Sequence, residues 1–326
     1  MIPLTSDTFL VDNSMLEFIT TCPYLAYQSI VRRRRPAGDS PPLRFGAFIH
    51  NALAYRYANE HDSELDHPIE RRMLDILSDN FRATPCELEG WRSYDNAVKV
   101  IRAYNTFYPK EDFFVAENVA THAPYVEQPF AVDTHQIIRG RRIIYTGKID
   151  LKVVFPDHTK YTLDHKTSSV LGDTFWSDQQ MTGQHRGYVW ADRECTGEEC
   201  TGYIVNALGC KESLANAVFD ENLGQLIPGL TNSGRASKAT PVEFARQRFF
   251  TAVPPGQIDE WYENMLAQVD MFLYCVEKNS FPRHTRHCIY KYGPCQFYNV
   301  CSLPKESREN ALMSGAYAEN TWTPLY

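Results

Sequence analysis

The chain of 326 residues lacks any apolar run of membrane-spanning length, and its first residues lack the basic and apolar regions of a signal peptide. We therefore expect a soluble, cytoplasmic protein with no membrane partner. Internal repeats and low-complexity tracts are also missing. Hydrophobic residues make up 43% and aromatic residues 13% of the chain, which is enough for a packed core in one large or two modest domains and excludes extensive disorder.

A surplus of positive charge is missing as well. The chain has 33 Lys and Arg against 40 Asp and Glu, a net charge of −7. This balance argues mildly against a nucleic-acid partner, although local clusters, rather than net charge, govern the field that a ligand meets. Basic clusters occur at residues 32–35, 139–142 and 283–291. Taken alone, each cluster is more simply a solubilising surface.

A disulfide framework is not indicated, because nine cysteines are an odd count in a long chain. Metal or cluster ligation is the remaining question. Cys288, Cys295 and Cys301 follow one another as C-x6-C-x5-C in an aromatic segment. Three thiols need a fourth ligand to close a four-thiolate site. Cys22, which is followed by another aromatic segment, is the best candidate.

The identity of this metal site stays open between two chemistries. Gaps of six and five residues are longer than the two to four usual between paired zinc ligands, which favours an iron–sulfur cluster. His284 and His287 keep zinc as a minority alternative. The other five cysteines are more simply buried or incidental thiols (Cys86, Cys195, Cys200, Cys210 and Cys275). Of these, Cys195, Cys200 and Cys210 offer a weak second metal site.

The segment from Gly147 to Ser168 predicts two strands joined by a turn at residues 156–158, because apolar and polar residues alternate on both sides of that break. If the hairpin has no bulge, Asp150 and Asp164 face each other, with Lys166 on the same face as Asp164. Like charges placed opposite one another destabilise a sheet. A divalent cation between them removes this repulsion, and Mg²⁺ is typically held by one or two carboxylates. A solvated strand face is an equally good explanation of the hairpin alone.

Elsewhere the patterns predict helices from Ser14, with Glu17 completing a capping box, from Gly46, and over 66–83, 91–107, 173–193 and 258–278. They predict strands over 113–120, 124–133, 136–146, 201–207 and 242–252. His50 shares a helix face with apolar residues, so by itself it is better explained as a histidine at the edge of the core. A polar stripe of Gln180, Gln184 and Tyr188 on the 173–193 helix is typical of a site or of an exposed face.

Together these motifs resemble the PD-(D/E)XK nuclease superfamily, in the RecB-like branch that carries a four-iron cluster, from Cys22 to Cys301. Similar patterns occur in CRISPR-associated iron–sulfur exonucleases, AddB-type nuclease domains and phage exonucleases. The matching motifs, in the order of the family, are Gly46-x-x-x-His50, Gly147-Lys-Ile-Asp150, Asp164-His-Lys166, Gln184-x-x-x-Tyr188 and the four cysteines Cys22, Cys288, Cys295 and Cys301.

The resemblance implies an α/β, restriction-endonuclease-like fold, with a mixed central sheet flanked by helices. An N-terminal helical region (1–110), a nuclease core (111–280) and a C-terminal cluster-binding segment with its tail (281–326) are expected to form one compact unit. A 4Fe-4S cluster on the four cysteines would join the N- and C-terminal segments. Mg²⁺ or Mn²⁺ would be held by His50, Asp150, Asp164 and the main chain of His165, with Glu127 in the outer shell.

By the same resemblance the chain is a metal-dependent DNA exonuclease acting on single strands or ends, with endonuclease or flap activity as a further option. Recombination, repair and phage DNA processing are the implied settings. Lys166 would orient the attacking water or steady the charge at phosphorus, while Gln184 and Tyr188 hold the strand. DNA contact is expected at the arginine clusters and depends on salt. The alternative function is a DNA-end-binding accessory subunit of a recombination or CRISPR-adaptation complex.

Overall fold

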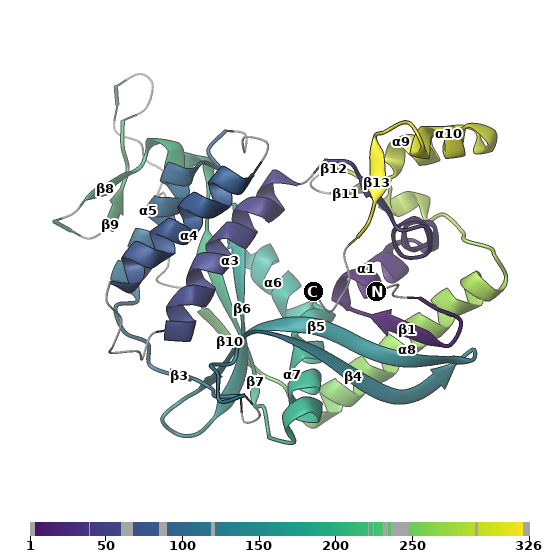
Figure 1. Cartoon of the computed structure of the whole chain (residues 1–326), viewed down its shortest axis with the longest axis horizontal. Coiled ribbons are helices and arrows are strands. Elements are labelled where there is room, and N and C mark those ends of the chain that lie inside the picture. Colours follow the sequence, from purple (N-terminus) through teal and green to yellow (C-terminus); the bar gives the residue numbers. More distant parts are fainter. Residues whose placement is uncertain are drawn as a thin grey trace.

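The computed structural model describes residues 4–38, 40–59, 68–84, 90–118, 121–220, 222–223, 225–230, 234–235, 248–290 and 293–321. Within these ranges seven strands form one mixed sheet of order β1-β5-β6-β7-β10, with β3 and β4 also paired to β5. The strands are β1 (Thr8–Val11), β3 (Phe114–Val115), β4 (Val126–Ile138), β5 (Arg141–Val154), β6 (Lys160–Ser168), β7 (Gly202–Gly209) and β10 (Arg248–Ala252). Helices flank the sheet (Figure 1), so the expected α/β class with a mixed central sheet is confirmed.

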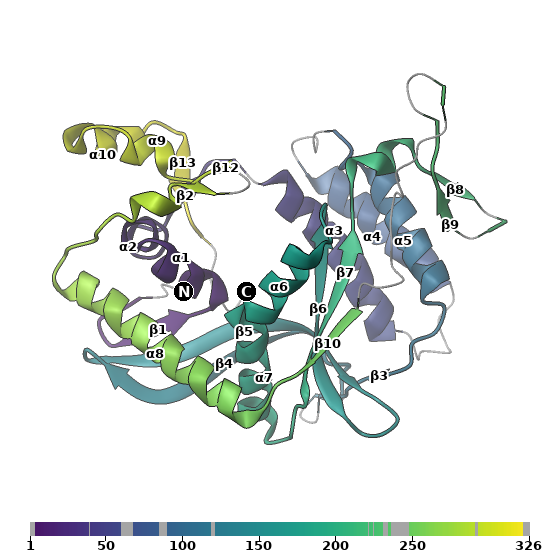
Figure 2. The same ribbon diagram turned by 180° about the vertical axis from the view of Figure 1, so that it is seen from behind.

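The buried strand β7 separates two hydrophobic cores. Tyr203 and Val205 pack into a core with α1 (Asn13–Thr21), α7 (Gly183–Thr196) and α8 (Pro255–Glu277). Ile204 and Leu208 pack into a core with α3 (Pro41–Asn59), α4 (Ile69–Ala83) and α5 (Tyr94–Phe107). Successive side chains of a strand point to opposite faces, so each helix group covers one face of the sheet. Figure 2 shows α8 running along the long arms of β4 and β5. No helix of the described ranges has the length and apolarity needed to cross a bilayer.

The sheet forks along β5. Residues Arg142–Tyr145 of this strand pair in parallel with β1, whereas Leu151–Val154 pair antiparallel with β6. Residues 146–150 lie between these two ladders, where one neighbouring strand has ended and the next has not begun. On this side the segment has no ladder partner, whereas its other edge pairs with β4.

The two ends of the described chain meet beside α1. β2 (Arg34–Pro36) pairs antiparallel with β13 (Tyr317–Glu319), and Arg32 forms an ion pair with Glu309 at 2.5 Å. A small third core of Leu25, Phe297, Val300 and Leu312 lies under these contacts. The elements gathered here are α2 (Pro23–Ala26), a π-helical turn (Tyr27–Val31), α9 (Tyr298–Cys301) and α10 (Arg308–Leu312) (Figures 1 and 2).

Three boundary predictions are wrong for identifiable reasons. Helix α1 begins at Asn13 rather than Ser14, because Asp12 caps it by accepting from the Met15 N–H at 2.8 Å. The strand predicted over 136–146 is divided by a turn at residues 139–140, where both backbones have positive φ. The single helix predicted over 173–193 is two helices, α6 (Asp173–Met181) and α7, because Thr182 takes an extended conformation and caps α7.

Two further predictions have the wrong bounds: the helix predicted from Gly46 begins at Pro41 (α3), and in the described part of the strand predicted over 113–120 only Phe114–Val115 form a strand (β3). The remaining elements lie close to their expected bounds. The helices predicted over 66–83, 91–107 and 258–278 are α4, α5 and α8, and the strand predicted over 201–207 is β7. Of the strand predicted over 242–252, residues 248–252 form β10, and the part before residue 248 lies outside the described residues, as does Cys86. Two short strands that the sequence did not predict, β8 (Val218–Asp220) and β9 (Gln225–Ile227), pair antiparallel.

One buried ion pair offers a test of how the α7 face is stabilised. Lys152 is 2% exposed, and its Nζ lies 3.0 Å from Oδ1 of fully buried Asp192. Removing one partner leaves an uncompensated buried charge, so Lys152→Met is expected to lower the free energy of unfolding by about 3–5 kcal/mol in urea titrations. Lys160→Met, which removes a partly exposed partner of Glu198, should cost less than about 1 kcal/mol. Equal effects of the two variants would contradict a stabilising buried pair.

Candidate functional site

Three carboxylates lie in a row across three adjacent strands. Leu151 of β5 is paired with Leu163 of β6 on one side and with Val126 of β4 on the other. One residue further along, this register sets Asp150 opposite both Asp164 and Glu127. The hairpin register predicted from the sequence is therefore confirmed, and β4 adds a third acid that the hairpin alone did not show. Asp150 is 8% exposed and Asp164 is 4% exposed, so water screens their repulsion poorly.

Helix α3 brings an imidazole to this row. His50 Nδ1 lies 3.3 Å from Oδ2 of Asp150. The approach depends on Gly46, one turn earlier, where an added Cβ would lie 2.8 Å from the Thr167 hydroxyl of β6. The glycine of the Gly46-x-x-x-His50 motif therefore lets the helix contact the strand that carries Asp164. His50 is positioned by the site as well as by the core.

The electrostatics of this group suit a bound cation. Burial, followed by the charges of Asp164 and Glu127, raises the pKa of Asp150 well above its usual range. Burial also lowers the pKa of His50, which favours the neutral imidazole that can act as a ligand. Within the described ranges, one ligand atom each of His50, Glu127 and Asp150 lies within 4.8 Å of the others. Carboxylate oxygens suit Mg²⁺ or Mn²⁺, and a neutral imidazole is a common metal ligand.

The Asp-x-Lys and Gln-x-x-x-Tyr motifs meet on the other side of Asp164. Lys166 Nζ lies 2.7 Å from Asp164 Oδ2 and donates to Gln184 Oε1 at 3.2 Å. The Gln184 amide in turn donates to Asp164 Oδ1 at 3.3 Å and to the Tyr188 hydroxyl at 3.0 Å. Burial opposes the charge of Lys166, but Asp164 and Asp150 outweigh it and raise the pKa of the lysine. The break at Thr182 matters here, because it places Gln184 in the first turn of α7, whereas Gln180 lies exposed on α6.

His165 contributes its main chain toward the row and its side chain away from it. Its N–H donates to Asp150 Oδ2 at 2.8 Å. The ring, 2% exposed, stacks on Tyr57 and accepts from the Asn206 amide through Nδ1 at 2.7 Å. Burial lowers the pKa of His165 well below its usual range, so the ring is neutral.

A buried hydrogen-bond network under His165 was missed by the sequence interpretation. Arg248 of β10 donates to Asn206 at 3.2 Å and to Glu111 at 2.9 Å. Tyr57 also donates to Glu111, at 2.7 Å. Through the His165 ring, these residues hold β6, the strand that carries Asp164 and Lys166. No short-range spacing in the sequence links positions 57, 111, 206 and 248, so this network had no sequence signal beyond the polarity of its members.

Glu127, expected in the outer shell, has a ligand atom within 4.8 Å of those of His50 and Asp150, whereas Asp164, expected as a ligand, is not in this group. The backbone of Glu127 has a φ of 52°, a conformation that is rare for a non-glycine residue and clusters at functional sites. Lys148, which was not singled out, forms an ion pair with Glu127. Lys148 lies two residues before Asp150 on β5 and therefore points to the same face of the strand. This spacing was the only sequence signal for the lysine.

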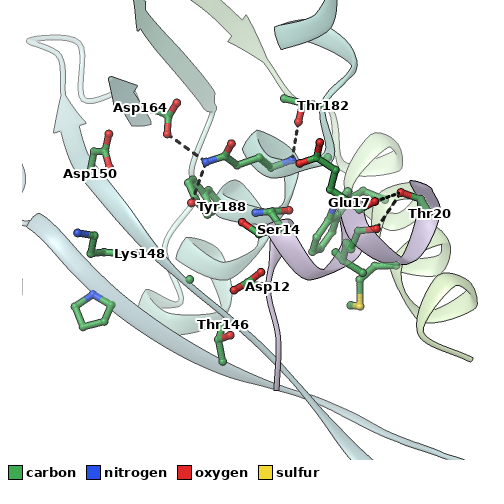
Figure 3. A pocket seen from close by; sticks show the side chains of 18 of the residues that line it. Asp12, Ser14, Glu17, Thr20, Thr146, Lys148, Asp150, Asp164, Thr182 and Tyr188 are labelled. Atoms are coloured by element: carbon green, nitrogen blue, oxygen red, sulfur yellow. Dashed lines mark hydrogen bonds between the residues drawn. The ribbon is translucent and has the colours of Figure 1, made fainter. Parts of the chain in front are cut away.

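These groups line one cavity of about 740 Å³. Figure 3 shows Asp150, Asp164 and Lys148 on one side, Asp12, Ser14, Glu17 and Thr20 of the α1 segment on the other, and Tyr188 between them. The cavity opens where the sheet forks, since Thr146, Gly147, Lys148 and Asp150 all contribute to its wall. The nuclease-type site residues predicted from the sequence, His50, Asp150, Asp164, Lys166, Gln184 and Tyr188, all line it. His165 is not among its lining residues.

The C-terminal cysteines are brought together by a small hairpin. β11 (Ile289–Tyr290) pairs antiparallel with β12 (Gly293–Pro294), and the Cys295 N–H donates to the Cys288 carbonyl at 2.8 Å. The register makes Cys288 and Cys295 the pair that follows Ile289 and Pro294. The backbones of Cys288 and Cys295 are therefore brought side by side although six residues separate them in the sequence.

Cys22 and Cys301 lie beside this hairpin. The His284 N–H points at the Cys22 sulfur at 3.4 Å, and Cys22, Cys295 and Cys301 pack on the same small core. The pKa of Cys301 is raised by burial and then by three neighbouring thiols, those of Cys295, Cys288 and Cys22. These contacts bring the four thiols into one region, and the metal or cluster that they hold stays a prediction.

The basic clusters make intramolecular contacts. Arg33 and Arg32 pair with the C-terminal segment through Glu319 and Glu309. Arg139 pairs with Asp270 and Glu277 of α8, and Arg283 donates to the Cys301 carbonyl. These arginines therefore hold distant segments of the chain together, and their contact with DNA stays a prediction.

In comparisons with known proteins, no family model and no curated protein sequence matches the chain.

Proposed function

We propose that the protein is a metal-dependent deoxyribonuclease that hydrolyses phosphodiester bonds in the cavity at the fork of the sheet. One observation carries the proposal: the row of Glu127, Asp150 and Asp164 lies beside His50 and Lys166 in a single cavity. Acids that repel one another at low exposure are explained by a cation between them. A lysine next to them provides for negative charge on a reacting phosphate.

The roles of the side chains follow from their contacts. His50, Glu127, Asp150 and Asp164 would hold a divalent cation, which would supply Lewis-acid polarisation of a phosphate and lower the pKa of a bound water. Lys166 is held by Asp164 and Gln184, so its ammonium group has a fixed position for stabilising charge at phosphorus. Gln184 forms hydrogen bonds with Lys166, Asp164 and Tyr188 and thereby fixes these three side chains at the end of β6.

We further propose that Cys22, Cys288, Cys295 and Cys301 hold a 4Fe-4S cluster of structural role. Cys22 directly follows α1, and the other three lie beyond α8, so a cluster would fasten the N-terminal helix to the C-terminal segment. The gaps of six and five residues between the C-terminal cysteines, and the apolar side chains around the thiols, support this assignment over zinc.

The acids are tested by a conservative substitution. Asp164→Asn keeps the shape of the side chain but removes a charge that a cation and Lys166 both contact. Hydrolysis of labelled single-stranded DNA in Mg²⁺ or Mn²⁺ should fall by at least about a hundredfold. Asp178→Asn, on the exposed side of α6, serves as the matched control and should keep the rate of the unsubstituted protein. Undiminished hydrolysis by Asp164→Asn refutes the site, and DNA binding without any hydrolysis favours the end-binding accessory function.

The cluster is tested by colour and melting together. Cys295→Ser should give colourless protein with less iron and a melting temperature lower by about 3 °C or more, a shift that about 2 kcal/mol produces in a chain of this size. Cys275→Ser, which replaces a half-buried thiol on α8, should stay brown and melt normally. Zinc instead of iron in the unsubstituted protein, measured by elemental analysis, would assign the site to the other metal.

A further inference from the structure

Lys148 lines the cavity but has no role in the function proposed above. It belongs to β5, two residues before Asp150, so the two side chains point to the same face of the strand. Figure 3 shows Lys148 next to Asp150, on the wall of the cavity that also carries Asp164. Its side chain is 56% exposed, whereas that of Lys166 is 29% exposed. Of these two lysines, Lys148 is therefore the more accessible to a ligand.

Glu127 is the partner of Lys148 and also belongs to the carboxylate row. The two side chains form an ion pair, and within the described part of the chain the Lys148 ammonium group has no other partner. The Glu127 carboxylate has an oxygen within 4.8 Å of ligand atoms of His50 and Asp150. One carboxylate is thus placed to contact two cations, the ammonium group of Lys148 and a divalent ion at the row.

A divalent ion is the stronger partner for Glu127. An ion pair that water reaches shifts an equilibrium by about fivefold or less, whereas a divalent ion has twice the charge and is held by several ligands at once. When Glu127 neutralises that ion, it no longer neutralises Lys148. In the described lining of the cavity, Lys148 and Lys166 are each paired with an acid, among five carboxylates. A phosphate that enters the cavity therefore finds an unneutralised lysine only after this exchange.

The two lysines lie on diverging strands. The ladder between β5 and β6 ends next to Asp150 and Asp164. Continued by two residues, the same register would set Lys148 opposite Lys166. Figure 1 shows the long arm of β5 turning away from β6 beyond this point, so the lysines belong to the two arms of the fork. A nucleic acid strand with one phosphate at the row and Lys166 can therefore place a neighbouring phosphate at Lys148.

We propose that Lys148 forms a second phosphate site, which becomes available when the divalent cation binds. The cation takes Glu127 as a ligand, and the ammonium group released from the ion pair binds the phosphate of a nucleotide next to the scissile one. An ammonium group suits a phosphate oxygen because it offers three N–H donors and no acceptor. The inference rests on the proposed function, since the nuclease site is what brings the cation and the strand to the cavity. The strand is thereby held tightly only when the cation needed for hydrolysis is bound.

The experiment measures DNA binding without turnover. All proteins carry Lys166→Met, which keeps the proposed cation ligands and removes the lysine proposed to act at phosphorus, and a gel establishes that the DNA stays intact. A fluorescein-labelled single strand of about twelve nucleotides is titrated by anisotropy in Mn²⁺ and, separately, in EGTA. Adding Lys148→Met should weaken binding about tenfold in Mn²⁺, the effect of one hydrogen bond between charged groups, and about twofold or less in EGTA.

The salt dependence and two further variants identify the contact as one to a phosphate. In Mn²⁺, the slope of log affinity against log salt should fall by about 0.7 with Lys148→Met, the value for one phosphate of a single strand. Lys148→Arg keeps the charge and also binds phosphate, so it should restore both slope and affinity. Lys278→Met removes a lysine of similar exposure that pairs with Glu277 and is not among the described residues of the cavity lining. This control should change neither quantity.

A double-mutant cycle tests the exchange itself. Glu127→Gln removes the group that neutralises Lys148, so on this background Lys148→Met should weaken DNA binding in EGTA about tenfold rather than twofold. Without DNA, Mn²⁺ measured by electron paramagnetic resonance should bind Lys148→Met about two- to fivefold more tightly, because the ammonium group no longer competes for Glu127. A lysine that only supported the fold would weaken both ligands together when replaced. Melting curves establish that each variant is folded.

The outcomes separate this inference from the proposed function. Equal losses of DNA affinity in Mn²⁺ and EGTA, no loss in Mn²⁺, weaker Mn²⁺ binding by Lys148→Met, or no DNA binding at all overturns the exchange. Hydrolysis in Mg²⁺ by the unsubstituted protein alongside any of these results leaves the nuclease standing and refutes the exchange alone. Cation-dependent DNA binding that needs Lys148, without hydrolysis by the unsubstituted protein in Mg²⁺ or Mn²⁺, supports the exchange and refutes hydrolysis.

Discussion

Repulsion between three carboxylates on adjacent strands is the constraint around which the site is arranged. Glu127, Asp150 and Asp164 share one row. Burial is the main cause that raises the pKa of Asp150, and the charges of the other two acids raise it further. Each acid has a cationic or hydrogen-bonding neighbour: Lys148 for Glu127, the His165 N–H for Asp150, and Lys166 for Asp164. These contacts reduce the cost of the row without filling the space between its members, which is where a cation suits the geometry.

The fold supports this arrangement through a few local devices. The fork in β5 leaves residues 146–150 outside the ladders with β1 and β6 at the centre of the sheet. Gly46 lets α3 contact β6, and Thr182 ends one helix and starts another so that Gln184 reaches Lys166. The network of Glu111, Arg248 and Asn206 fixes the strand from the opposite side. Helix α1 connects two functional regions, because Asp12 at its start lines the cavity and Cys22 at its end adjoins the other cysteines.

The sequence predicted what depends on short-range pattern. The alternation around residues 156–158 predicted the hairpin register that aligns Asp150 with Asp164, and helical spacing predicted α4, α5 and α8. It could not predict contacts between distant positions. Glu127 joins the row through the pairing of β4 with β5, and Arg248 reaches His165 through Asn206. The cap of α1 was also misplaced, because the sequence predicted Ser14 with Glu17, whereas Asp12 caps the helix.

The central claim, that this row binds a divalent cation, is tested most directly by Mn²⁺ binding to protein freed of metals, followed by electron paramagnetic resonance. The account predicts that Mn²⁺ binds at the row, that excess Mg²⁺ displaces it, and that it is lost when Asp150 is replaced by Asn. Absence of Mn²⁺ binding, or binding that Asp150→Asn leaves unchanged, would contradict it.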